Sequence, residues 1–158
     1  DEPEIVISVH KDFIRAGASA AGRDFSELDI VAPVGILIGD NVQELIDMRK
    51  PGIAFNCGAM GSEKTNFYRD AFVRAGYADD ALAVAQLWRQ GHRDEAAARV
   101  PDAMVTEFAA IGTPEMVLER LRKYRNVGVT TLTLRIEGNT IRDRIDLLEQ
   151  SVDLVRAC

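Results

Sequence analysis

The chain has 158 residues, a length that suits one domain built around a single core. Hydrophobic residues make up 47% and charged residues 28%, a composition that argues against a disordered, collagen-like or coiled-coil protein. The 19 Lys and Arg residues against 25 Asp and Glu give a formal charge of -6, without a dense cationic cluster. Nucleic acid is therefore not an expected partner.

The cysteines and the first residues bear on the compartment. Cys57 and Cys158 are the two cysteines of the sequence, too few for a disulfide framework or a zinc knuckle, and they favour a reducing cytoplasm. The apolar run over residues 5–9 is too short for a signal peptide or a membrane span, so no membrane partner is expected. The sequence begins without methionine, which suggests a fragment or a processed piece.

The first third of the chain predicts a helix and then a strand. Apolar residues recur at helical spacing over residues 3–21. The run "IVAPVGILI" at 30–38 is almost continuously apolar, which is typical of a strand that helices cover on both faces of a parallel sheet. Pro33 and Gly35 predict that this strand is irregular.

The middle of the chain, over residues 41–110, predicts helices alone. Asp40 or Asn41 is a plausible cap for the first helix, and Pro51 is expected to kink or restart it. Ser62 is expected to open a second helix that runs to Gly76. Three more helices are predicted over residues 77–91, 92–100 and 102–112.

The last third predicts a helix, a second strand and a closing helix. Thr113 is a cap with Pro114 at the first helical position, and Gly128 ends that helix. A β-branched run over 129–136 predicts a strand, and residues 139–158 predict the last helix. Strands separated by helices pair in parallel, yet two strands cannot bury both faces of residues 30–38. Either a partner chain supplies further strands, or the sequence is the tail of a larger α/β fold.

Four stretches carry a resemblance to a known family: "AGRDFSELDIV" at 21–31, "RKPGIAFNCGAMGSEKTNFYRD" at 49–70, "AGYADDALAVAQLWRQGHRDEAAARVPDAMV" at 75–105 and "IGTPEMVLERLRKYRNVGVTTLTL" at 111–134. In these stretches the chain resembles the luciferase-like monooxygenases, and among them the actinobacterial type that uses the deazaflavin coenzyme F-420. The resemblance implies an α/β fold that is the C-terminal portion of a TIM (β/α)8 barrel, mostly helical as a fragment. Residues 1–158 would form one domain fragment with the last two strands of the barrel, and residues 41–110 would be a helical insertion between them.

The same resemblance implies an oxidoreductase. Its cofactor would be deazaflavin coenzyme F-420, with FMN as the alternative, and it would transfer hydride or oxygen to a small organic substrate. The catalytic residues would lie in the absent first half of the barrel, so this piece would be inactive by itself. Its expected partners are the small-molecule substrate and either the missing N-terminal half or further copies in a homo-oligomer.

Five residues are candidate cofactor contacts. The glycine-rich stretch before a predicted helix is either an anion cradle or only a joint that lets two helices pack, since "GAMGSEK" matches neither standard phosphate loop. A charged residue at the C-terminal end of a barrel strand faces the active-site mouth, where it either binds an anion or forms an ion pair with Glu137 or Asp143. The candidates are Gly58, Gly61, Ser62, Asn66 and Arg135.

Other chemistries find no support in the sequence. His10 and His92 have no Cys, His or carboxylate at ligand spacing, so no metal site and no Ser-His-Asp arrangement are expected. Cys57 is interpreted as a small buried hydrophobe. The alternative function is a truncated, non-catalytic module that self-associates through its open strand edges.

Overall fold

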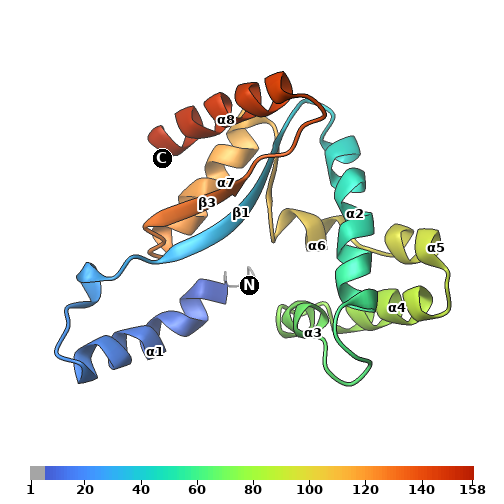
Figure 1. The fold of residues 1–158 in the computed structure, drawn as a ribbon, viewed down its shortest axis with the longest axis horizontal. Coiled ribbons are helices and arrows are strands. Elements are labelled where there is room, and N and C mark those ends of the chain that lie inside the picture. The colour runs from blue at the N-terminus through green and yellow to red at the C-terminus, as the bar shows by residue number, and fades with distance from the viewer. Residues whose placement is uncertain (1–5) are drawn as a thin grey trace. The chain divides into compact units, whose positions relative to one another are not determined.

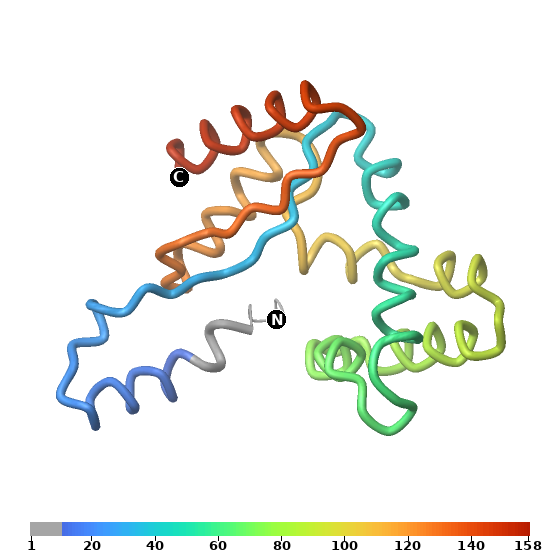
Figure 2. Tube along the Cα trace, viewed as in Figure 1, coloured from blue at the N-terminus to red at the C-terminus, as the bar shows by residue number. Residues whose placement is uncertain are grey.

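A computed structural model describes the backbone of residues 6–158 and the side chains from residue 11 onward. The Cα positions divide this part of the chain into two compact units (Figures 1 and 2). Unit 1 combines the chain up to Asp40 with Ala110–Cys158, and unit 2 is Asn41–Ala109. Each unit is described by itself.

Unit 1 contains a three-stranded parallel sheet with the order β2-β1-β3. In its register Val34 lies beside Leu134 and Ile36 beside Ala110, so β1 is the central strand. The elements of the unit are α1 (Val6–Ala20), η1 (Phe25–Glu27), β1 (Val31–Ile38), β2 (Ala110–Gly112), α7 (Pro114–Asn126), β3 (Thr131–Arg135) and α8 (Ile141–Arg156).

One face of this sheet carries the core of unit 1. Side chains alternate between the faces of a strand, and Ala32, Val34 and Ile36 of β1 are buried with Val117 and Leu121 of α7. Both α7 and α8 contact β1. On the opposite face Val31, Pro33, Thr131, Thr133 and Arg135 are exposed, whereas Leu37 near the end of β1 is buried. The expectation that residues 30–38 are buried on both faces is therefore met at Ile36 and Leu37 but not over residues 31–35.

The sequence predicts two strands, and the structure contains a third. Residues 110–112, which the sequence assigns to the end of a helix, form β2, while the helix before them, α6 (Asp102–Thr106), is short. Pairing of Ile36 with Ala110 and Ile38 with Gly112 gives this segment backbone partners along the edge of β1. Such pairing depends on a strand about 75 residues away, and tertiary context overrides a weak local helix preference.

Unit 2 consists of helices joined by turns. Its elements are α2 (Val42–Ala59), α3 (Phe67–Arg74), α4 (Ala78–Arg89), α5 (Arg93–Ala98) and α6. The long helix α2 packs against α3, α4, α5 and α6. Small residues line this contact, since Ala54, Ala81, Ala85 and Ala96 are fully buried. The described elements of residues 41–109 are all helices, as predicted, whereas Ala110 belongs to β2. The interpretation of this segment as an insertion between two barrel strands stays a prediction.

Two local predictions in unit 2 are corrected. α2 continues through Pro51 to Ala59, so the proline does not restart the helix. Ser62 does not open α3: the side chain of Asn66 accepts from the backbone N–H of Arg69, which makes Asn66 the N-cap. Ser62 instead forms hydrogen bonds with Thr65 in the turn that precedes α3. Among the described residues no helix combines the length and the apolar character that crossing a membrane requires.

Candidate functional site

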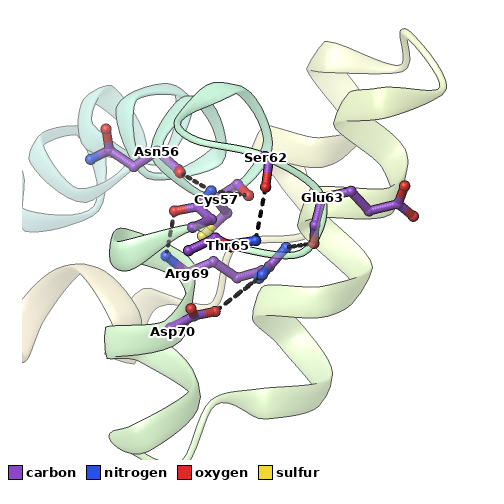
Figure 3. Close-up of polar contacts among 8 residues, drawn as sticks. Asn56, Cys57, Ser62, Glu63, Thr65, Arg69 and Asp70 are labelled. Atoms are coloured by element: carbon purple, nitrogen blue, oxygen red, sulfur yellow. Dashed lines mark hydrogen bonds and ion pairs between the residues drawn. The ribbon is translucent and has the colours of Figure 1, made fainter.

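The loop between α2 and α3 holds three of the five candidate residues, while Gly58 lies in the last turn of α2, and the turn of this loop is closed by two reciprocal hydrogen bonds. The N–H of Ser62 donates to the carbonyl of Thr65 at 2.8 Å. The N–H of Thr65 donates to the hydroxyl of Ser62 at 3.0 Å (Figure 3). A serine hydroxyl that accepts from a nearby N–H stabilises a turn without help from a ligand. These polar groups of Ser62 and Thr65 therefore stabilise the loop by bonding to each other.

Asn66 fixes the end of this loop to the end of α2. Its amide nitrogen donates to the carbonyls of Asn56 and Cys57, at 2.8 Å each. Those carbonyls belong to the last turn of α2, where a helix has no partners of its own for them. The side-chain oxygen of Asn66 caps α3 at 3.0 Å from the N–H of Arg69, and the residue is 2% exposed. One asparagine thus joins two helices and has both amide donors in use.

Arg69, in the first turn of α3, is a buried cation that contacts the same loop. Its guanidinium donates to the carbonyl of Glu63 at 3.0 Å and to Oδ1 of Asp70 at 3.1 Å (Figure 3). The residue is only 7% exposed, and a cation at such depth needs both hydrogen bonds and a carboxylate. Arg69 therefore stabilises the loop through its buried hydrogen bond to the carbonyl of Glu63.

Both candidate glycines have packing reasons to be glycine. A Cβ on Gly58 would collide with the side chain of Trp88 in α4. Gly61 has a φ of +77°, a left-handed conformation that side chains other than glycine rarely adopt, and its Cβ would lie 2.4 Å from the carbonyl oxygen of Thr65. The structure thus accounts for both glycines by helix packing and turn geometry.

Cys57 lies on the buried side of the same α2 turn. Burial raises the pKa of its thiol to about 11, and the charge of Arg69 opposes this only in part. A thiol of such high pKa is protonated and unreactive at neutral pH. The interpretation of Cys57 as a buried hydrophobe agrees with this burial.

Arg135 lies in unit 1, at the C-terminal end of β3. Its side chain is 79% exposed, and its Nε lies 3.4 Å from a carboxylate oxygen of Glu137. In the sheet register it stands beside Gly35 of β1, which places no side chain next to it. The predicted ion pair with Glu137 is therefore present, and the guanidinium is open to solvent on the face of the sheet opposite the core.

Of the two histidines, His92 has a described side chain. His92 lies 2.7 Å from a carboxylate oxygen of Glu95 at the start of α5, and the side chain of His10 lies outside the described residues. In the part of the chain whose side chains are described, no group of three His, Cys, Asp or Glu residues is placed to hold a metal ion.

The structure brings Gly58, Gly61, Ser62 and Asn66 together where α2 ends and α3 begins, and it places Arg135 in the other unit. Sequence reasoning missed Thr65 and Arg69, although the Ser-x-x-Thr spacing of 62 and 65 is a detectable turn signal. The burial of Arg69 has no such signal, because an arginine beside an aspartate is ordinary on a surface. Of the five candidates, Arg135 has a largely exposed side chain with an ion pair to Glu137. For all five, a role in cofactor binding stays a prediction.

Comparison with known proteins gives concordant results. Residues 3–131 match the model of the luciferase-like monooxygenase family. A Mycobacterium tuberculosis protein named as a coenzyme F420-dependent oxidoreductase is 33% identical over 122 residues, which are 77% of this chain and 34% of that protein.

A solved structure shares the fold. The coenzyme F420-dependent tetrahydromethanopterin reductase of Methanopyrus kandleri superposes with a TM-score of 0.71 at 25% identity, over 92% of this chain and 40% of that one. The chain thus spans between a third and a half of the length of these two relatives. Because the family model covers most of the sequence, the chain belongs to the luciferase-like monooxygenase family.

Proposed function

We propose that the protein to which this chain belongs is a coenzyme F420-dependent oxidoreductase that acts on a small organic molecule. The observation that carries the proposal is the agreement of two separate comparisons. A sequence relative and a structural relative, from a bacterium and from Methanopyrus, both have names that state dependence on coenzyme F420. The deazaflavin, when bound, supplies the hydride chemistry, and FMN with oxygen transfer is the alternative.

In this proposal unit 1 contributes part of a barrel wall. Parallel strands in such enzymes present their C-terminal ends to the active site. Arg135 is at that end of β3, with an exposed guanidinium and the glycine position of β1 beside it. Its role would be to bind and orient an anionic group of the coenzyme or the substrate. The sheet face opposite the core, with Val31, Thr131 and Thr133 exposed, would meet the rest of the barrel.

The test is coenzyme binding by the intact protein. Fluorescence of the oxidised deazaflavin is followed during titration with the protein, and a parallel titration uses FMN. We expect saturable quenching of the deazaflavin at micromolar protein and much weaker quenching of FMN. Tighter binding of FMN would replace the deazaflavin assignment, and no binding of either would overturn the oxidoreductase proposal.

The sheet edges support a second candidate, the self-associating module. In the described chain β3 pairs with β1 along one edge and has no strand on the other. An open edge in a sheet is a template for another strand. Light scattering during size-exclusion chromatography distinguishes the candidates: concentration-dependent oligomers without coenzyme binding favour the module, whereas coenzyme binding by a species of fixed mass favours the enzyme.

A further inference from the structure

The middle of α2 carries a proline and a glycine side by side. The helix runs over Val42–Ala59 without a break, and Pro51 and Gly52 lie inside it. Pro51 has no N–H to donate to the carbonyl of Asp47, which the helical pattern would pair with it, and a proline ring crowds that carbonyl. Glycine is the poorest helix former after proline, because it loses the most backbone freedom when a helix forms. The two residues therefore make the middle of α2 its weakest point.

The half of α2 before Pro51 is attached to α6. Nζ of Lys50 lies 2.7 Å from Oδ1 of Asp102, the first residue of α6, and 2.8 Å from Oδ1 of Asp47. The side chain of Lys50 is 16% exposed, so its two ion pairs are partly shielded from water. A residue before a proline tends to leave the helical conformation, and these ion pairs act against that tendency. This half of the helix thus has an anchor of its own.

The half of α2 after Gly52 is attached to α3 and α4. The amide nitrogen of Asn66, the N-cap of α3, donates to the carbonyls of Asn56 and Cys57. The ring of Phe55 packs edge-on against Trp88 of α4, with the ring centroids 5.7 Å apart. These contacts go to other helices than the ion pair of Lys50 with α6. The two halves of α2 are therefore anchored separately, on either side of its weakest point.

We propose that α2 is hinged at its Pro-Gly pair, so that residues 42–50 move with α6 while residues 53–59 move with α3 and α4. Hinges are a few residues that absorb a change of backbone angles between parts that stay packed, and sharp bends in helices occur at prolines. The loop between α2 and α3 moves with the second half. All of the anchors lie within unit 2, so the hinge depends neither on the proposed coenzyme chemistry nor on which further segments contact this unit.

Hydrogen exchange of the intact protein measures whether the two halves open separately. Peptide mass spectrometry follows the amides of residues 43–50 and of residues 53–59. Asp102→Asn removes the charge that pairs with Lys50, so we expect exchange of residues 43–50 to rise roughly threefold, the size of an ion pair of this exposure. Exchange of residues 53–59 should not change, because the break in the middle of the helix confines the opening to the first half.

Asp80→Asn is the matched control. Asp80 of α4 forms an ion pair of 2.6 Å with Arg99, the residue that ends α5, so its loss removes a similar contact within unit 2. This variant should not raise exchange of one half of α2 above that of the other.

The double variant Pro51→Ala, Gly52→Ala removes the hinge. It is expected to fold, because alanine favours the helix and a Cβ on Gly52 meets nothing within 4 Å. Exchange of residues 53–55 should slow by roughly tenfold or more, since alanine replaces the two poorest helix formers. In this background Asp102→Asn should raise exchange of both halves together, because an uninterrupted helix forms and opens cooperatively.

Three results would overturn the proposal. An equal rise in both halves on Asp102→Asn alone would show that α2 opens as one unit. Unchanged exchange of residues 43–50 in that variant would remove the anchor on α6. Exchange of residues 53–55 as fast in the double variant as in the wild type would show that the middle of α2 is not a weak point. Far-UV circular dichroism verifies the fold of each variant.

Discussion

Gly58 and Trp88 approach so closely that no β-carbon fits between them: a Cβ on Gly58 would lie 2.2 Å from Cγ of Trp88. The contact joins α2 to α4, and Trp88 also packs edge-on against Phe55 of α2. The glycine in "CGAMG" is therefore a packing residue of unit 2, whatever else it does.

Gly58→Ala should destabilise unit 2 by about 1–3 kcal/mol, because the added methyl group forces Trp88 or the helix to move. Gly52→Ala is the matched control in the same helix, since a Cβ there meets nothing within 4 Å. It should stabilise by about 0.5–1 kcal/mol through helix propensity. Urea unfolding followed by the emission of Trp88, the single tryptophan, measures both. Equal effects of the two changes would contradict the packing account.

Asn66→Ala should cost about 2–3 kcal/mol, because α3 loses its cap and two buried carbonyls of α2 lose their donors. Asn66→Asp should cost at least as much, since the carboxylate keeps the cap but faces the carbonyls of Asn56 and Cys57. Urea midpoints are compared with those of Asn41→Ala, an exposed N-cap of α2 that loses its cap and an exposed hydrogen bond to Glu44 but no buried partner. If Asn66→Ala costs no more than Asn41→Ala, the link between α2 and α3 contributes nothing.

The buried thiol of Cys57 predicts a loss of stability at alkaline pH. Its pKa is raised from the ordinary 9.0 to about 11, so the folded state holds a proton that the unfolded state releases between these values. The contribution of the protonated thiol to the free energy of unfolding is complete below pH 9 and is lost as the pH rises toward 11.

Other groups titrate in the same window, including Tyr124, whose pKa burial also raises. The measurement is therefore a difference: urea unfolding of the wild type and of Cys57→Ala at pH 8 and pH 10.5. The gap between the two proteins should narrow or invert at the higher pH. A constant gap would show that Cys57 does not titrate differently on folding.

Arg135→Gln should weaken binding of the coenzyme or an anionic substrate by about tenfold, because a charge-assisted hydrogen bond to the anion is lost. The free energy of unfolding of this variant should hardly change, since the exposed ion pair between Arg135 and Glu137 contributes little to it. Arg142→Gln is the control, because Arg142 is 83% exposed and pairs with Asp146. Deazaflavin titration and urea unfolding of both variants are needed. Unchanged binding in Arg135→Gln would remove Arg135 from the site.

Elements with strong local signals were predictable. Thr113 caps α7 with Pro114 in its first turn, and the helix ends just before Gly128, as expected. The strand over 31–38 follows from its unbroken apolar run. In both cases the information lies within about ten residues, in capping groups or in hydrophobic pattern.

The errors fall where the deciding partner is distant in the sequence. β2 is three residues long and exists through its pairing with β1. The start of α3 at Asn66 depends on carbonyls of α2 that are about ten residues away, so Ser62 was the wrong cap. The proline in α2 is tolerated because the rest of the helix packs against its neighbours in unit 2.

The sequence alone determined the family and the type of most elements, because motif spacing, caps and hydrophobic period are local properties. It also placed the candidate loop at the end of α2. Only the tertiary structure showed that Asn66 and Arg69 form hydrogen bonds inside unit 2 and that Gly58 and Gly61 have no room for a side chain there. It also showed that the side chain of Arg135 is exposed to solvent. Burial and hydrogen-bond partners depend on which segments meet in space, and no local pattern records that.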